Sequence, residues 1–424
     1  QRYVLVLRLV SGRSGVAGVI VRHSRGPRFC SLGLRLRDPL QLDKALKLAE
    51  PVALAAGVPA VIAARREDAP GLVTYQFELK RGLWKSYSRG QLTGLEIGVG
   101  EANRPLPFTF EHNPHAGVFG ATNSGKTETT RTIVHALAST YNPAQMKLVI
   151  IDRHHDFDDF RRLQHLALPL AHDDALTDRA LAWVGDALAH RIERNIRDAA
   201  KVVLVIDEAE DILADARRFA IVQKIGKEAR KFGVHLIMAT QKPNQTRLPD
   251  LLPNVLNRYV GLVDNAHTSA RLTGKPGLNC HQLTGQGDFM HVEGPTAERL
   301  QIALTTARDL ETLPWGEEPP LPEPARADTP ILLNVPGARP GRPPNRLQHP
   351  FGPRGTRREP GAARDAQTLC PGHPHRIGKV GLWNFPALGS QAARWRLCSP
   401  ASSWSCSTAR PGGATFRPSS SWRR

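Results

Sequence analysis

Residues 120–127 carry the residue types and the spacing of a phosphate-binding loop. They read GATNSGKT and fit the pattern GxxxxGK[ST]. In such a loop, successive backbone N–H groups point at the β-phosphate of a nucleotide, and the following helix adds the positive end of its dipole. Lys126 is expected to reach the β- and γ-phosphates, and the Thr127 hydroxyl to bind Mg²⁺. The residues predicted to line this ATP site are Gly120, Ala121, Thr122, Asn123, Ser124, Gly125, Lys126 and Thr127.

Asn123 stands where loops of this shape usually carry another glycine. A tight turn at that point favours a positive φ, and Asn tolerates this conformation better than other non-glycine residues. We therefore expect Asn123 to leave the phosphate-binding loop functional.

Two further apolar segments are followed by polar residues that suit nucleotide chemistry. Asp207 and Glu208 follow the run KVVLVI, and Gln241 follows GVHLIMAT. Ligands of open α/β sheets bind at the carboxyl ends of the strands. Asp207 is therefore predicted to hold Mg²⁺, directly or through water, and Glu208 to act as the base that polarises the attacking water. The carboxamide of Gln241 is predicted to contact the γ-phosphate or that water; a solvated strand end is the alternative.

A parallel sheet would position these residues at one edge. Between about residues 114 and 304, short apolar runs alternate with longer amphipathic segments, and residues 126–140 have the pattern of an amphipathic helix. Strands buried on both faces of a parallel sheet, joined by crossover helices, have this pattern. The predicted fold class is α/β, of the RecA-like P-loop NTPase type, with helices flanking the sheet. The five expected strands are 116–120, 147–152, 201–208, 233–240 and 259–263.

Three zones follow one another along the chain. Residues 1–110 combine apolar alternation, as in 3–10, with one helical run at 40–57, and are predicted to form a small α+β domain. Residues 111–313 form the predicted α/β domain. Residues 314–424 are rich in Pro, Gly and Arg, and we expect them to be disordered. Out-of-frame translation of a GC-rich gene is the alternative explanation for this tail.

The formal net charge of +18 is concentrated in the tail. Residues 321–424 hold 16 Lys and Arg residues against 4 Asp and Glu residues. Overall charge is therefore a weak argument for a nucleic-acid partner of the α/β domain. Five scattered cysteines without a CxxC pair, and apolar runs too short to cross a bilayer, predict a cytoplasmic protein without a membrane segment. The chain opens on Gln1 rather than Met, which leaves open whether a segment precedes it.

Four segments together resemble the motor domain of the FtsK/SpoIIIE/HerA superfamily of DNA translocases. They are PHAGVFGATNSGKT, VVLVIDEAED, GVHLIMATQKP and LTGQGDFMH, in the family's order between residues 95 and 305. The resemblance implies an ATPase with Glu208 as catalytic base and Gln241 as sensor. It also implies a homo-oligomeric ring, expected to be a hexamer, that translocates double-stranded DNA without sequence readout.

In such rings, an arginine of the next subunit completes each nucleotide site. Arg258 in NVLNRYVGLV is the preferred candidate by this resemblance, and Arg271 and Arg230 are alternatives. The membrane-spanning region and the winged-helix module of the cell-division translocases are not recognisable, which favours a mobile-element or plasmid translocase. A conjugation or secretion ATPase is one alternative. A HerA-like end-processing motor that acts with a separate nuclease is another.

Two loops at the expected ligand edge have opposite character. Residues 241–247, QKPNQTR, are basic and are the preferred candidate for a loop that grips DNA phosphates. Residues 152–162 are expected to form a solvated acidic loop rather than a metal site, because no ligand spacing of a known type is present. The potential ligands in that loop are His154, His155, Asp156, Asp158 and Asp159.

Overall fold

The structure is a computed structural model that describes residues 1–65, 69–241 and 247–321. The predicted tail beyond residue 321, and with it the out-of-frame alternative, lies outside the described residues. So does most of the basic loop 241–247.

The N-terminal part of the chain forms a small α+β unit around an antiparallel sheet of order β1-β2-β4-β3. The segment 3–10, expected to be extended, lies in a helix whose buried residues, Leu7 and Ser11, are four residues apart on one face. The helical run 40–57 is divided into two helices. The elements are α1 (Arg2–Arg13), β1 (Gly18–Arg25), β2 (Phe29–Leu36), α2 (Leu42–Leu46), α3 (Ala49–Ala56), β3 (Val61–Arg65) and β4 (Leu72–Glu78).

The rest of the described chain is built around a nine-stranded sheet of order β6-β5-β13-β12-β11-β7-β10-β9-β8. Its strands are β5 (Glu96–Val99), β6 (Pro105–Pro107), β7 (His115–Phe119), β8 (Met146–Ile151), β9 (Lys201–Ile206), β10 (Val234–Thr240), β11 (Asn257–Val260), β12 (Asp288–Glu293) and β13 (Thr296–Ile302). The five predicted strands are β7 to β11, and all pairings among them are parallel. The predicted α/β fold is confirmed.

The sheet continues beyond β11 with antiparallel strands that the sequence pattern did not assign to it. Strands β12, β13, β5 and β6 follow one another in antiparallel pairs. Residues 96–107 therefore belong to the large sheet, although the predicted domain limit at residue 110 places them in the N-terminal domain. The change from one sheet to the other lies between β4 and β5.

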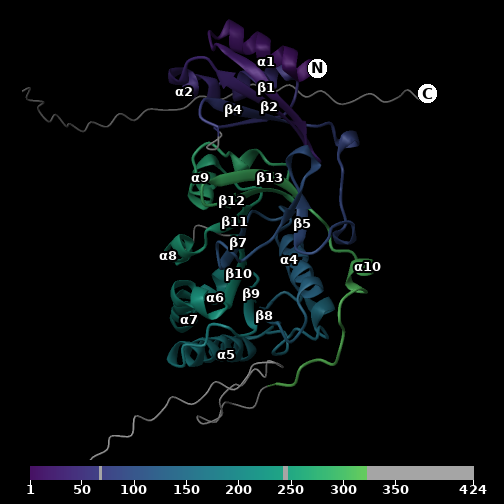
Figure 1. Cartoon of the computed structure of the whole chain (residues 1–424), viewed down its shortest axis with the longest axis vertical. Coiled ribbons are helices and arrows are strands. Elements are labelled where there is room, and N and C mark those ends of the chain that lie inside the picture. Colours follow the sequence, from purple (N-terminus) through teal and green to yellow (C-terminus); the bar gives the residue numbers. More distant parts are fainter. Residues whose placement is uncertain (66–68, 242–246, 322–424) are drawn as a thin grey trace, which may run out of the picture. The chain divides into compact units, whose positions relative to one another are not determined.

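Helices cover both faces of the large sheet, with α4 on one face and α6 and α7 on the other (Figure 1). The helix predicted after the phosphate loop is α4, and it spans the predicted residues. The helices of this part are α4 (Lys126–Thr140), α5 (Asp174–Glu193), α6 (Ala209–Leu213), α7 (Ala216–Glu228), α8 (Leu248–Leu251), α9 (Ala266–Thr273) and α10 (Ala307–Leu310).

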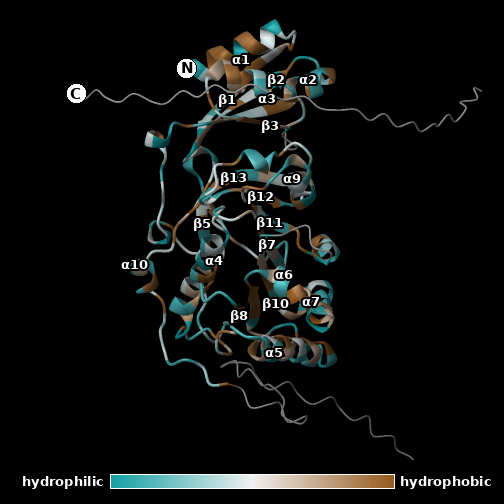
Figure 2. Ribbon diagram, turned by 180° about the vertical axis from the view of Figure 1, so that it is seen from behind, coloured by the Kyte–Doolittle hydropathy of each residue, from teal (hydrophilic) through white to brown (hydrophobic). Residues whose placement is uncertain are grey.

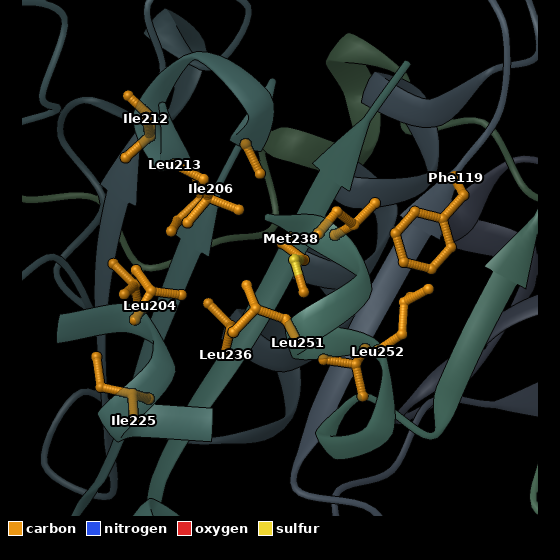
Figure 3. Close-up of a cluster of buried hydrophobic side chains, with 14 of the residues drawn as sticks. Phe119, Leu204, Ile206, Ile212, Leu213, Ile225, Leu236, Met238, Leu251 and Leu252 are labelled. Carbon is orange, nitrogen blue, oxygen red and sulfur yellow. The ribbon is translucent and has the colours of Figure 1, made fainter. Parts of the chain in front are cut away.

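Side-chain alternation along the strands divides the interior into two apolar layers. On β9, Leu204 and Ile206 face the layer shared with α5, α6 and α7, while Val203 and Val205 face the layer shared with α4. Figure 3 shows the first layer, which contains Leu236 and Met238 of β10 and Ile225 of α7. Apolar colouring is strong on β10, whereas α5 carries both colours (Figure 2). The strands that lead to the predicted site are thus held from both faces.

Candidate nucleotide site

Every predicted nucleotide residue except Arg258 lies at the carboxyl edge of the parallel strands. The loop 120–125 follows β7, Asp207 and Glu208 follow β9, and Gln241 follows β10. Because β9, β10 and β7 are neighbours in the sheet, their ends bring these segments together.

The phosphate loop has the backbone geometry that its sequence predicts. Asn123 has a φ of 63°, so the expected left-handed conformation is confirmed. Gly125, with a φ of 97°, precedes α4, which begins at Lys126. The Ser124 N–H donates to the Ala121 carbonyl at 3.1 Å and closes a tight turn. The first turn of α4 leaves N–H groups without helical partners, as an anion site requires.

A loop from a later part of the chain packs against the phosphate loop. The N–H groups of Gln286 and Gly287 donate to the carbonyls of Asn123 and Ser124, at 3.0 and 2.8 Å. A Cβ atom on Gly125 would lie only 2.7 Å from the Gly287 nitrogen. This contact, together with the positive φ of Gly125, explains why glycine occurs at position 125. The segment LTGQGDFMH, which the sequence indicated only through the family resemblance, thus holds the phosphate loop in place.

Lys126 and Asp207 are both buried at the start of α4 and the end of β9, with 5% and 1% of their surfaces exposed. Burial lowers the pKa of Lys126, while the nearby carboxylates of Glu208, Asp207 and Glu210 oppose that shift. Burial also raises the pKa of Asp207 to about 7, and the charges of Glu208 and Asp152 add to this shift. The buried part of the site therefore contains more carboxylates than positively charged groups.

Asp207 has the properties of a cation ligand. Neither of its carboxylate oxygens has a hydrogen-bond partner among the described residues, although both are buried. Such a pair of orphaned acceptors is costly unless something binds them. Oxygen ligands are those that Mg²⁺ prefers, so Asp207 fits the predicted ion. Asp152 and Asp156, which the sequence reasoning did not assign to the ion, offer carboxylate oxygens within 4.8 Å of an Asp207 oxygen.

Glu208 is joined to the phosphate loop through Gln241. The Gln241 amide donates to one carboxylate oxygen of Glu208, and its carbonyl oxygen accepts from the Thr122 hydroxyl at 2.7 Å. The other oxygen of Glu208 is buried and has no described partner. Glu208 also has a left-handed backbone, with φ 48° and ψ 57°, which is strained for a residue with a side chain. Gln241 thus connects the predicted base with a residue of the loop.

Glu210, not singled out from the sequence, is a further buried acid of this edge. It is 8% exposed and accepts a hydrogen bond from the Thr240 hydroxyl, and burial raises its pKa. Its position three residues after Asp207 in the run DEAED was a visible signal, but only the fold shows that it turns inward.

Arg258 does not fit the role expected of it. It lies within β11 with 9% of its surface exposed, and its guanidinium donates to the carbonyls of Val255, Leu272 and Leu252 at 2.6 to 2.9 Å. An arginine that completes the nucleotide site of a neighbouring subunit must be exposed, whereas the Arg258 guanidinium binds carbonyls of its own chain. Of the alternatives, Arg230 is exposed and Arg271 is half-buried.

Among the described residues, no helix is both long enough and apolar enough to cross a bilayer.

Comparison with known proteins identifies a matching family model and curated relatives. Residues 78–200 match the model of the FtsK/SpoIIIE family. The chain is 25% identical over 250 residues to the DNA translocase SftA of Bacillus subtilis, covering 53% of this chain and 26% of that protein. It is 23% identical over 356 residues to the DNA translocase FtsK of Staphylococcus epidermidis, covering 73% of this chain and 44% of that protein. The chain thus spans less than half the length of these two relatives.

Two solved structures are also similar. One is the cytoplasmic domain of the type VII secretion ATPase EccC of Thermomonospora curvata, with 22% identity, a TM-score of 0.47 and coverage of 54% of this chain and 32% of that one. The other is the pCW3 conjugation coupling protein TcpA, in a monomer form with ATPγS, with 13% identity, a TM-score of 0.48 and coverage of 73% and 96%.

Proposed function

Since the chain carries an FtsK/SpoIIIE-family domain, we propose that it is an ATP-hydrolysing motor that translocates double-stranded DNA without reading its sequence. The observation that carries this proposal is the meeting of the phosphate loop, Asp207, Glu208 and Gln241 at one sheet edge. The relatives that are named DNA translocases support DNA as the substrate.

The loop and the start of α4 bind the triphosphate in this proposal. Backbone N–H groups of the loop and the Lys126 ammonium bind its phosphate oxygens. The Thr127 hydroxyl and the Asp207 carboxylate hold Mg²⁺, and the orphaned oxygens of Asp207 support this assignment. A bound Mg²⁺ would neutralise charge on the β- and γ-phosphates.

Glu208 and Gln241 act on the water in this proposal. Glu208 accepts the proton of the attacking water through the carboxylate oxygen that has no described partner. The Gln241 amide donates to the other carboxylate oxygen of Glu208 and accepts from the Thr122 hydroxyl. When the phosphate loop moves around a bound phosphate, Gln241 can therefore transmit the movement to Glu208. The same contact makes Gln241 suitable as a sensor of the bound nucleotide.

We further propose that the motor is a ring, expected to be a hexamer, and that Arg230 completes the nucleotide site of a neighbouring subunit. Arg230 replaces Arg258 in this role because it is exposed in the segment between α7 and β10, where it can contact another chain. An arginine supplied in trans stabilises the charge of the transition state and raises kcat on the order of 10³-fold or more.

The test is the ATPase rate without DNA, with single-stranded DNA and with duplex DNA, followed by displacement of a third strand from a triplex. Duplex DNA is expected to stimulate hydrolysis and to permit displacement. A rate that ignores DNA would contradict the proposal and favour a secretion-type ATPase, and stimulation by single strands alone would favour a conjugation-type motor.

Two substitutions connect this activity with the site. Glu208→Gln is expected to keep ATP binding and to lower turnover by about 10² to 10⁴-fold, the usual contribution of a general base. Lys126→Ala is expected to lose both binding and turnover. Full ATPase activity in Glu208→Gln would disprove the assignment of the base.

A further inference from the structure

The loop after β8 meets a histidine from a later part of the chain. His155 and Asp158 lie in this loop, and His172 lies just before α5. One carboxylate oxygen of Asp158 is 3.3 Å from His155 Nδ1 and 3.2 Å from His172 Nε2. Two imidazoles thus share one carboxylate, an arrangement that the spacing within residues 152–162 does not reveal.

The hydrogen bond on the other side of His172 fixes its tautomer. His172 Nδ1 lies 2.6 Å from the carbonyl oxygen of Asp152. A carbonyl can only accept, so Nδ1 carries the hydrogen, and in the neutral ring Nε2 presents a lone pair. That lone pair faces a carboxylate oxygen of Asp158 at 3.2 Å. Two acceptors at this distance require a proton or a cation between them.

The distances suit a metal ion as the shared cation. At Zn²⁺ bond lengths of about 2.0–2.2 Å, neighbouring ligand atoms of a tetrahedron lie about 3.3 Å apart. The two distances from Asp158 to the imidazole nitrogens are 3.2 and 3.3 Å, and the three ligand atoms lie within 4.8 Å of one another. A histidine ligand whose second ring nitrogen donates to a backbone carbonyl, as His172 does, is typical of metal sites.

We propose that His155, Asp158 and His172 bind a divalent transition-metal ion of the zinc type. Imidazole with a carboxylate suits Zn²⁺ better than Mg²⁺, which prefers oxygen ligands. Three protein ligands leave a fourth position for water. Its three ligands are different residues from those of the predicted nucleotide site, and the inference does not depend on the proposed function.

Binding requires one movement. The rings of His155 and His172 are stacked, with centroids 3.9 Å apart and planes 21° apart, so their in-plane lone pairs do not yet converge. The side chain of His155 is 59% exposed and has room to turn out of the stack, whereas that of His172 is 23% exposed. His172 and Asp158 would thus form the fixed part of the site, and His155 would close it.

The test uses the untagged chain without nucleotide, in excess Mg²⁺. Zn²⁺ is titrated by calorimetry and Co²⁺ by its visible absorption. We expect one equivalent of either ion to bind. His155→Ala and His172→Ala should each weaken binding by more than about tenfold, since even outer-shell substitutions commonly reach that factor. The matched control is His154→Ala, because His154 is an exposed neighbour in the same loop and is not part of the three-residue cluster.

Absence of Zn²⁺ and Co²⁺ binding by the wild-type chain would overturn the proposal. Unchanged affinity in His155→Ala and His172→Ala would also overturn it, because the ion would then bind elsewhere. If His172→Ala fails to fold by circular dichroism, His155→Ala still decides, since its ring is largely exposed.

Discussion

Asn123 carries a backbone conformation that a β-branched residue adopts only at a cost. Its φ is 63°, and left-handed geometry costs most residues about 1–2 kcal/mol. Asn123→Gly is therefore expected to preserve nucleotide affinity, whereas Asn123→Val should weaken it by roughly 5- to 30-fold if the strain is released by distorting the loop. Titration with a fluorescent ATP analogue measures both. Equal affinities in the two variants would show that the loop does not need this conformation.

Local sequence was sufficient to predict most of the candidate site. Residues 120–127 form one continuous turn, and Asp207 and Glu208 follow directly from the end of an apolar run, so their positions depend on neighbours in sequence. The contact between Thr122 and Gln241 joins residues 119 positions apart, and only strand order creates it. The surroundings of Arg258 could not be predicted for the same reason: nothing local indicates that its guanidinium turns toward the carbonyls of its own chain.

At the scale of elements, the loop between η8 (Cys280–Gln282) and β12 supports the phosphate loop through Gly287. Gly287 has a φ of 87°, and a Cβ there would lie 2.7 Å from the Gln301 side-chain nitrogen. Gly287→Ala should therefore displace the N–H that holds Ser124 and weaken ATP binding as well as stability. Gly277→Ala is the matched control, because Gly277 has a similar φ of 89° and nothing within 4 Å of its would-be Cβ.

Comparison of the two alanine variants separates backbone strain from contact. Both should lower the midpoint of thermal unfolding, because each forces alanine into a positive φ. Only Gly287→Ala should also lower affinity for an ATP analogue. If Gly277→Ala weakens nucleotide binding as much as Gly287→Ala, the loss arises from stability and not from the contact with the phosphate loop.

Neighbouring strands β7 and β10 contain two buried histidines that predict acid sensitivity. Burial lowers the pKa of His115 to about 4 and that of His235 to about 3. Since both values lie below 6.5, the unfolded chain binds these protons first, and the free energy of unfolding should fall as pH drops from about 6.5 to 4. The loss is at most about 1.4 kcal/mol per pH unit and histidine.

Urea unfolding at pH 5 and pH 7 measures this loss. Asp207, whose pKa is raised to about 7, acts in the opposite direction over this whole range, so a variant is needed to isolate the histidines. His115→Asn keeps an acceptor for the Leu236 N–H, which donates to His115 Nδ1 at 3.1 Å. The difference in stability between the two pH values should be smaller in this variant. An unchanged difference would rule out His115 as its source.

The five parallel strands could be predicted because each is a short, wholly apolar run buried on both faces. The antiparallel extension was not predicted, since β5 and β6 lie before the phosphate loop in sequence and join the sheet beyond β13. Segment 3–10 was misassigned because nearly every position is apolar, and such a run fits a helix as well as a strand. The conformation and the place of these segments depend on the elements that they pair or pack with, and not only on the secondary-structure propensity of their residues.

At the scale of the whole molecule, a ring with shared sites predicts that two inactive variants restore each other. In the proposed arrangement, each site takes Glu208 from one subunit and Arg230 from the next. Glu208→Gln and Arg230→Ala should each hydrolyse ATP slowly when alone. In mixed rings, some interfaces combine an intact Glu208 with an intact Arg230, because a head-to-tail interface places different surfaces together. The ATPase rate of the mixture should then exceed that of either variant.

The same mixture distinguishes a ring from independent subunits. Without shared sites, mixing only averages two low rates, and no recovery occurs at any ratio. Lys231→Ala is the matched control for Arg230→Ala, because Lys231 is the next residue and is also exposed. Normal activity in Arg230→Ala alone would exclude Arg230 as the arginine supplied in trans. Recovery of the ATPase rate in the mixture, with duplex DNA present, would place the nucleotide site between subunits. As a control, this recovery should be lost when both substitutions occupy one chain.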